Sequence, residues 1–443
     1  RQMCIRDRPV MLQALIQSLV SLIDSFMVAG LGDVKMSGVN ISGQICFIFM
    51  VMQNMICASG GIFLTQYFGA KQREGMRQSV AFKVVASLST CIFYFLATFV
   101  FTRPVLSLMV IGNSQAELIL EEGQKYMYLM GFIGIQMMIS SILSSSYREI
   151  GRVRVILVIT LIAAGSNAFL NWVLIYGHLG MPRLEVQGAA YATIIAKTVE
   201  MLLLIGYTIK ERPEFISFSV FKRIDWALFG RILKKGSLLI ISQMMWVLSE
   251  SFTAAIYNGR GNAAVVSGMA ASFSIANLFF ISFDGITTAT GVLIGKSLGR
   301  NELDDARKEK TWMLSAAIIF GCIMCLVGVV TVLLVPVVFG NLSIDAQNIC
   351  RAMLLLMALF MPLWTFVNTQ LAVCRAGGDT KVGFLVDGGT TAVMIPMLLI
   401  LAFFTNASPV MMYFGVKALD VGKIIVATHE MKKERWVVNL SNA

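Results

Sequence analysis

The chain has 443 residues, of which 57% are apolar and only 14% are charged, and its mean hydropathy is +0.76. Soluble domains carry about 25% charged residues, so this composition excludes a soluble globular fold, a disordered chain and a collagen-like fibre. The net charge of +11 would indicate nucleic-acid binding only if the basic residues gathered on one soluble face, and they do not. The sequence therefore predicts an integral membrane protein, embedded in the lipid bilayer, with no nucleic-acid partner.

The first eight residues, RQMCIRDR, differ from the apolar run that follows them. They back-translate to CGT CAG ATG TGT ATA AGA GAC AG plus one further base, which resembles a transposase-adapter sequence used in sequencing libraries. A basic N-terminal tail ahead of a first span is the alternative. We interpret residues 1–8 as adapter-derived, and we expect the genuine protein to start upstream of Pro9, so that the first span is truncated here.

Twelve apolar runs follow, each long enough for a membrane-spanning helix and too long for a barrel strand. The first six are Pro9–Val28, Val39–Leu64, Val80–Phe101, Tyr126–Ser146, Val153–Tyr176 and Gly188–Ile209. The second six are Ser237–Tyr257, Ala263–Ile294, Trp312–Val335, Ile349–Val373, Val382–Phe404 and Pro409–Thr428. Lysines and arginines gather after the even-numbered runs and in the C-terminal tail. By the positive-inside rule, this asymmetry predicts that both termini are cytoplasmic.

The two sets of six runs repeat each other. Gly61–Arg77 reads GIFLTQYFGAKQREGMR, and Gly291–Arg307, at the same place in the second set, reads GVLIGKSLGRNELDDAR. Copies that each contain an even number of spans run parallel, about an axis along the membrane normal. The sequence thus predicts an all-α fold of twelve transmembrane helices in two pseudo-symmetric six-helix lobes. The predicted parts are an N-lobe (9–210), a cytoplasmic linker (211–236), a C-lobe (237–428) and a cytoplasmic tail (429–443).

Several motifs resemble the multidrug and toxic compound extrusion (MATE) transporters. They are PVMLQALIQSLVSLIDSFMVAGLG, TQYFGA, NAFLNWVLIYG, GAAYAT, LGRNELDDAR and KKERWVVNL. Asp24, with Asn167 and Asn171, is most similar to the DinF-like branch. The resemblance implies export of cationic or amphipathic compounds, in exchange for H⁺ or Na⁺, by alternating access. We expect a multi-pass monomer in a bacterial plasma membrane, with no enzymatic activity and no cofactor or metal beyond the coupling ion.

Asp24 is the leading candidate for ion coupling, because a carboxylate inside a span costs about 2.5–3.5 kcal/mol and is a functional candidate by default. Gln17 shares its helix face, Asn167 and Asn171 share a face of the fifth span, and Thr193 begins the sixth. By resemblance, Asp24 is the coupling carboxylate and the other four form its polar network. Asn171 departs from several relatives, which carry a second aspartate there. The alternative is that Asp24 is a water-exposed residue at a helix end.

Glu250 occupies the Asp24 position of the second half, and Gln243 occupies the Gln17 position. Relatives that bind sodium in this lobe pair such a glutamate with an acid in the tenth span, and the tenth span here has none. We therefore expect Glu250 to contact a cationic substrate, and a structural carboxylate is the alternative. Asp284 and its repeat counterpart Asn54 are expected to line the cavity.

Two further pairs, Lys197 with Glu200 and Lys417 with Asp420, are three residues apart and are expected to form structural ion pairs. The alternative function is a lipid-linked saccharide flippase of related architecture. A flippase would favour several arginines or lysines inside spans to hold a pyrophosphate, whereas this sequence keeps its arginines in the connections. A membrane enzyme would need clustered His, Cys or acidic residues at an interface, and the sequence indicates no such cluster.

Overall fold

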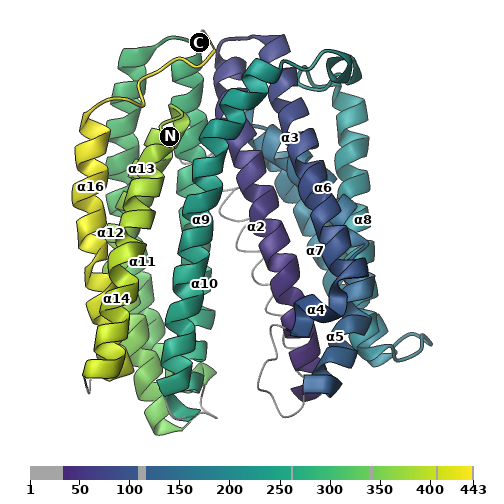
Figure 1. The fold of residues 1–443 in the computed structure, drawn as a ribbon, viewed down its shortest axis with the longest axis vertical. Coiled ribbons are helices and arrows are strands. Elements are labelled where there is room, and N and C mark those ends of the chain that lie inside the picture. The colour runs from purple at the N-terminus through teal and green to yellow at the C-terminus, as the bar shows by residue number, and fades with distance from the viewer. Residues whose placement is uncertain (1–32, 108–115, 261–262, 340–342, 406–407, 442–443) are drawn as a thin grey trace. The chain divides into compact units, whose positions relative to one another are not determined.

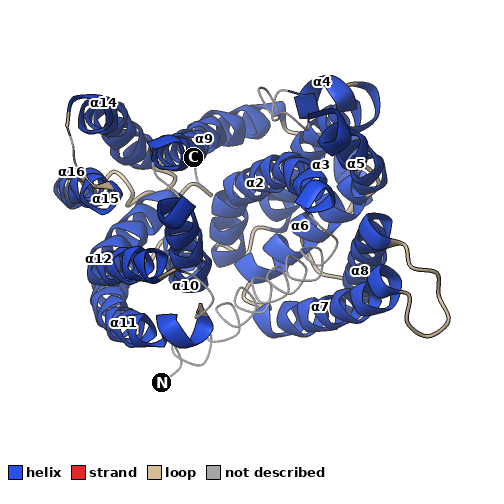
Figure 2. Cartoon of the chain, turned by 90° about the horizontal axis from the view of Figure 1, so that it is seen from below, coloured by secondary structure: helices blue, strands red, loops and turns tan. Residues whose placement is uncertain are grey.

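The computed structural model describes residues 33–107, 116–260, 263–339, 343–405 and 408–441. Within these ranges the chain forms helices and loops and no strand (Figure 2), which confirms the predicted all-helical class. Seven of the described helical segments are long and apolar enough to cross a membrane, and the number is eight if one bent pair of helices forms a single span. The first predicted span lies outside the described residues. The count of twelve and the orientation of the termini stay predictions.

The chain divides into two compact units. The first consists of Arg1–Leu64 and Arg73–Ile232, and the second of Thr65–Gln72 and Leu233–Ala443. Helix α2 (Asp33–Gly69) therefore starts in the first unit and ends in the second. Helix α9 (Trp226–Arg260) also crosses the boundary, because its first two turns belong to the first unit.

The first unit is built around the long helices α2, α3, α7 and α8, which Figure 1 labels. Its elements after α2 are α3 (Arg73–Phe95), the π-helical η1 (Leu96–Val100), α4 (Thr102–Ser107), α5 (Ala116–Met130), α6 (Ile133–Glu149), α7 (Val153–Tyr176), α8 (Glu185–Glu211) and the 3₁₀ turn η2 (Phe218–Lys222). Helices α7 and α8 lie side by side (Figure 2). Buried aromatic packing anchors the other side of the unit, where the Tyr94 ring stacks on Phe49 at 4.3 Å and its hydroxyl donates to the Met130 carbonyl at 2.9 Å.

The predicted fourth span, Tyr126–Ser146, is two helices rather than one. Helices α5 and α6 meet at an angle of 51°. Gly131 lies at the break, where a Cβ would come within 2.5 Å of the Phe99 ring. The ring packs against the chain at this point because the glycine has no side chain. A bend of this kind depends on a neighbour from another element, and hydropathy along one segment does not reveal it.

The second unit is centred on α12 (Ile344–Ala376), which packs against α10, α11 and α16. Its other elements are α10 (Ala263–Gly299), α11 (Leu303–Val338), α13 (Lys381–Gly383), the π-helical η3 (Phe384–Gly388), α14 (Gly389–Phe404), α15 (Pro409–Ala418) and α16 (Asp420–Lys432). Large apolar side chains also cover the outside of the helices, and Leu333 of α11 is 74% exposed. Such an exposed apolar exterior is typical of a lipid-facing surface.

The C-terminal strap, Lys433–Ser441, packs onto the end of the second unit. Trp436 is fully buried, and Leu440 donates its backbone N–H to Gln66 Oε1 at 2.5 Å. The Gln66 amide donates in turn to the Ala376 carbonyl at 2.7 Å. Glu434 accepts from the Arg307 guanidinium at 2.8 Å, and this hydrogen bond lowers the pKa of the Glu434 carboxyl below its ordinary value. The strap thus fastens the last turn of α2 to the end of α12.

The last turns of α2 and α10 meet backbone to backbone. A Cβ on Gly69 would lie 2.3 Å from the Lys296 carbonyl oxygen, and a Cβ on Gly299 would lie 1.9 Å from the Gln66 carbonyl oxygen. Gly69 and Gly299 are repeat counterparts, as are Gln66 and Lys296. The contact is therefore reciprocal. Each half of the repeat contributes one glycine, and because that glycine has no side chain, the backbone of the other helix can approach closely.

Candidate functional site

The structure brings together three of the polar residues predicted for ion coupling. Asn171 Nδ2 donates to Asn167 Oδ1 at 3.4 Å, and Asn167 Nδ2 lies 3.5 Å from Thr193 Oγ1. Asn167 and Asn171 are buried on α7, and Thr193 faces them from α8. The group forms a polar patch between two apolar helices. Asp24 and Gln17 lie outside the described residues.

A buried ion pair in the first unit was missed by the sequence analysis. Lys83 of α3 is completely buried, and its ammonium lies 2.6 Å from Glu149 Oε2 of α6. The same ammonium donates to the hydroxyls of Ser145 and Ser146 at 3.1 and 3.2 Å. All three ammonium protons therefore have acceptors, which burial of a charge requires. The sequence did contain a signal for a buried charge, because Lys83 interrupts the apolar run Val80–Phe101.

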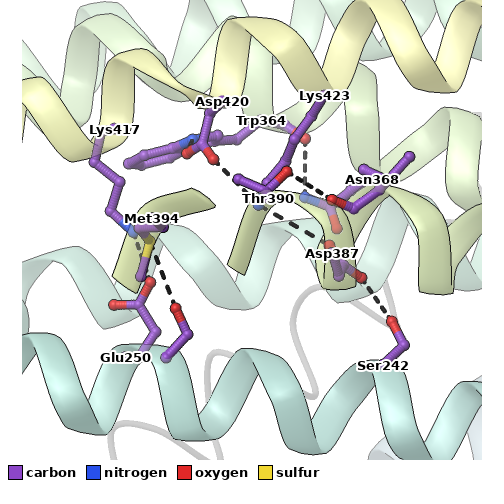
Figure 3. Close-up of polar contacts among 12 residues, drawn as sticks. Ser242, Glu250, Trp364, Asn368, Asp387, Thr390, Met394, Lys417, Asp420 and Lys423 are labelled. Atoms are coloured by element: carbon purple, nitrogen blue, oxygen red, sulfur yellow. Dashed lines mark hydrogen bonds and ion pairs between the residues drawn. The ribbon is translucent and has the colours of Figure 1, made fainter. Parts of the chain in front are cut away.

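In the second unit, Glu250 of α9 pairs with Lys417 of α15 at 2.6 Å (Figure 3). The Lys417 ammonium also lies 5.4 Å from the centroid of the Tyr413 ring and 5.8 Å from that of Trp364. Glu250 was expected to contact substrate, and here its negative charge is matched by a lysine of the same chain. That contact favours the structural alternative for Glu250.

The predicted pair of Lys417 with Asp420 is wrong. Asp420 instead pairs with Lys423 at 3.1 Å and accepts from the Trp364 indole at 2.8 Å. The reason is a helix break, because α15 ends at Ala418 and α16 begins at Asp420. Residues three apart face each other only on a continuous helix. On the uninterrupted α8, by contrast, the predicted pair of Lys197 with Glu200 is confirmed at 2.8 Å.

Asp387 is a second functional candidate that the sequence analysis missed. It lies on η3, where it accepts from Ser242 Oγ of α9 at 2.8 Å, while the Lys423 ammonium is 3.9 Å away (Figure 3). The signal for Asp387 was its position as an isolated acid in the apolar run Val382–Phe404. Lys423 thus lies between two carboxylates, and it is closer to Asp420.

The remaining predicted site residues lie on other helices. Gln243 is half-buried on α9 in the second unit, and Asn54 is exposed on α2 in the first unit. Asp284 lies on α10, and its side chain is outside what the structure describes. The arginines are not confined to the connections, because Arg351 lies within α12.

Comparison with known proteins identifies the family. The MatE family model matches residues 9–173 and 239–406. A relative named probable multidrug resistance protein NorM, from Halalkalibacterium halodurans, is 24% identical over 373 residues, which is 82% of this chain and 78% of the relative. The protein of the same name from Listeria innocua is 23% identical over 389 residues, 86% of this chain and 83% of the relative.

Solved structures share the fold. One is an outward-facing multidrug resistance MATE family transporter of the MOP superfamily, with a TM-score of 0.86, 17% identity, and coverage of 98% of this chain and 95% of the other. A MOP superfamily transporter from Pyrococcus furiosus has a TM-score of 0.84 at 17% identity, with coverage of 98% and 96%. Because the family model matches most of both halves of this helical membrane protein, the chain belongs to the MatE family.

Proposed function

We propose that this chain is a secondary active transporter that exports cationic or amphipathic small molecules in exchange for H⁺ or Na⁺, by alternating access. The observation that carries the proposal is the polar patch of Asn167, Asn171 and Thr193, buried between apolar helices in a chain of the MatE family. Polar groups at such depth are costly and mark ion or substrate paths. The relatives named as multidrug resistance proteins support the choice of substrate class.

In this proposal Asp24 binds and releases the coupling ion, and Gln17 with the polar patch surrounds it. Asp24 with the two asparagines also supports membership of the DinF-like branch, although the relatives above carry the name NorM. The basic connections support cytoplasmic termini in a bacterial plasma membrane. We further propose that the monomer suffices for transport.

No observation favours the flippase alternative. Four of the lysines inside helices of the described chain each contact a carboxylate within 3.1 Å. The four lysines are Lys83, Lys197, Lys417 and Lys423. A lysine already paired in this way has its charge compensated, so it is a poor partner for a lipid-linked pyrophosphate.

Asp24→Asn is expected to abolish gradient-driven export. Ethidium efflux from proteoliposomes is measured under an imposed proton or sodium gradient. The gradients supply about 1.4 kcal/mol per pH unit and about 2.3 kcal/mol per charge for each 100 mV, so the wild type should respond strongly to one of them. Asp345→Asn, at an exposed position in the first turn of α12, is the matched control and should export normally. Equal gradient dependence in the Asp24 variant and the wild type would contradict the assignment of Asp24.

A further inference from the structure

The connection between α8 and α9 carries an excess of positive charge. Residues 210–235 contain seven lysines and arginines and three acidic residues. A basic cluster of this size beside membrane-spanning helices is typical of segments that contact anionic lipid headgroups. Whether its charges can bind a ligand depends on which of them the protein already compensates.

The acidic residues of this connection are engaged by groups other than Lys222 and Arg223. Glu211 and Glu214 each pair with an arginine from elsewhere in the first unit, at 2.9 and 2.6 Å. Asp225 caps α9, where its Oδ1 accepts from two backbone N–H groups at 3.0 Å. Lys222 and Arg223 are exposed, and neither has a carboxylate partner among the described residues.

Two large aromatic side chains are exposed on either side of these charges in the chain. Phe221 is 42% exposed, and Trp226, the first residue of α9, is 66% exposed. Exposed apolar rings next to basic residues mark segments that lie at a membrane surface. An indole prefers the level of the lipid headgroups, because its ring is apolar and its N–H is polar.

The opposite side of the connection is held to the first unit. The Phe229 ring packs on Phe82 of α3, with the ring centroids 4.9 Å apart. The Gln78 amide of α3 donates to the Arg223 carbonyl at 2.8 Å and accepts from the Asp225 N–H at 3.1 Å. This attachment uses the backbone of Arg223 and leaves its side chain exposed. The basic and aromatic side chains are therefore displayed by a segment that is fixed on its other side.

We propose that residues 221–226 form a binding surface for the headgroups of anionic phospholipids. Lys222 and Arg223 contact the lipid phosphates, and the rings of Phe221 and Trp226 lie among the headgroups. Long basic side chains can reach the phosphates while their stems lie along apolar surface. A zwitterionic lipid compensates its phosphate with its own ammonium group, so two uncompensated cations favour a lipid of net negative charge. This surface is separate from the transport path proposed above.

Trp226 provides a direct readout of the lipid beside it. The full chain is reconstituted in vesicles of equal parts phosphatidylglycerol and phosphatidylcholine, with bromine atoms on the acyl chains of one lipid at a time. Bromine quenches an indole that it contacts, and the Trp226 signal is the difference between the wild type and Trp226→Phe. We expect stronger quenching by brominated phosphatidylglycerol. The enrichment should be about fivefold for each basic side chain, the equivalent of about 1 kcal/mol.

The double variant Lys222→Gln with Arg223→Gln keeps Trp226 and removes both charges. It should be quenched equally by the two brominated lipids, and added salt should reduce the preference of the wild type in the same direction. Lys381→Gln, at an exposed basic position of the second unit, is the matched control and should keep the full preference. Both positions of the double variant are exposed, so the folded state should tolerate it.

Three results would overturn the proposal. Absence of Trp226 quenching by either lipid would place this segment away from the bilayer, where another protein could contact it. Equal quenching of the wild type by both lipids would show no preference for negative charge. An unchanged preference in the double variant would exclude Lys222 and Arg223 as its source. Both leaflets contain both lipids and no gradient is applied, so none of these results depends on the orientation of the chain or on its transport activity.

Discussion

Lys83→Met should destabilise the protein by about 3–5 kcal/mol, since it leaves the Glu149 carboxylate buried without its cation. The Lys83 ammonium is completely buried and holds Glu149 at 2.6 Å, so neither charge is well solvated in the folded state. The free energy of unfolding can be compared by denaturant titration in detergent micelles, with helix content followed by circular dichroism.

The double variant Lys83→Met with Glu149→Gln separates lost charge pairing from lost packing. It removes both charges and should recover most of the stability, because no uncompensated ion remains. Lys197→Met is a second comparison, at a pair whose lysine is 32% exposed, and should cost clearly less. If the single Lys83 variant were as stable as the wild type, the pair would not be buried as described.

Gly299→Ala should prevent or severely weaken folding of the second unit. The added Cβ would lie 1.9 Å from the backbone oxygen of Gln66, and a backbone atom cannot move aside as a flexible side chain can. Overpacking of this kind costs about 1–3 kcal/mol, and occasionally more. The yield of monodisperse protein and its thermal stability measure the effect.

Gly291→Ala is the matched control on the same helix, because nothing lies within 4 Å of its Cβ position. It should be neutral or slightly stabilising, since alanine favours a helix over glycine by about 1 kcal/mol. Gly69→Ala, the repeat counterpart of Gly299→Ala, should be damaging too. Equal behaviour of the variants at Gly291 and Gly299 would refute the reciprocal backbone contact.

Local regularities made parts of this structure predictable. Hydropathy predicted the all-helical class. The three-residue spacing of Lys197 and Glu200 on one unbroken helix predicted their ion pair. The same rule failed for Lys417 and Asp420, because the break at Leu419 lies inside an apolar run that reads as continuous. Hydropathy does not mark a break when the helices on both sides of it are apolar.

Contacts between helices were harder to predict. Lys83 and Glu149 lie on different helices far apart in the chain, and a single sequence does not say which helices touch. Asp387 lies in the eleventh predicted span, and only the packed structure shows that it accepts a hydrogen bond from Ser242 of α9. Both residues are charges within apolar runs. Such interruptions indicate burial, but the compensating group is known only once the helices are packed.

The division of α2 between the units has a topological consequence. The chain passes from one unit to the other three times, after Leu64, Gln72 and Ile232. The connection between α8 and α9, where the two sequence repeats join, lies wholly within the first unit. A nick at that connection would therefore leave the N-terminal fragment threaded into the second unit by Thr65–Gln72, held there by the Gln66 hydrogen bonds. The two sequence repeats therefore do not coincide with the two compact units.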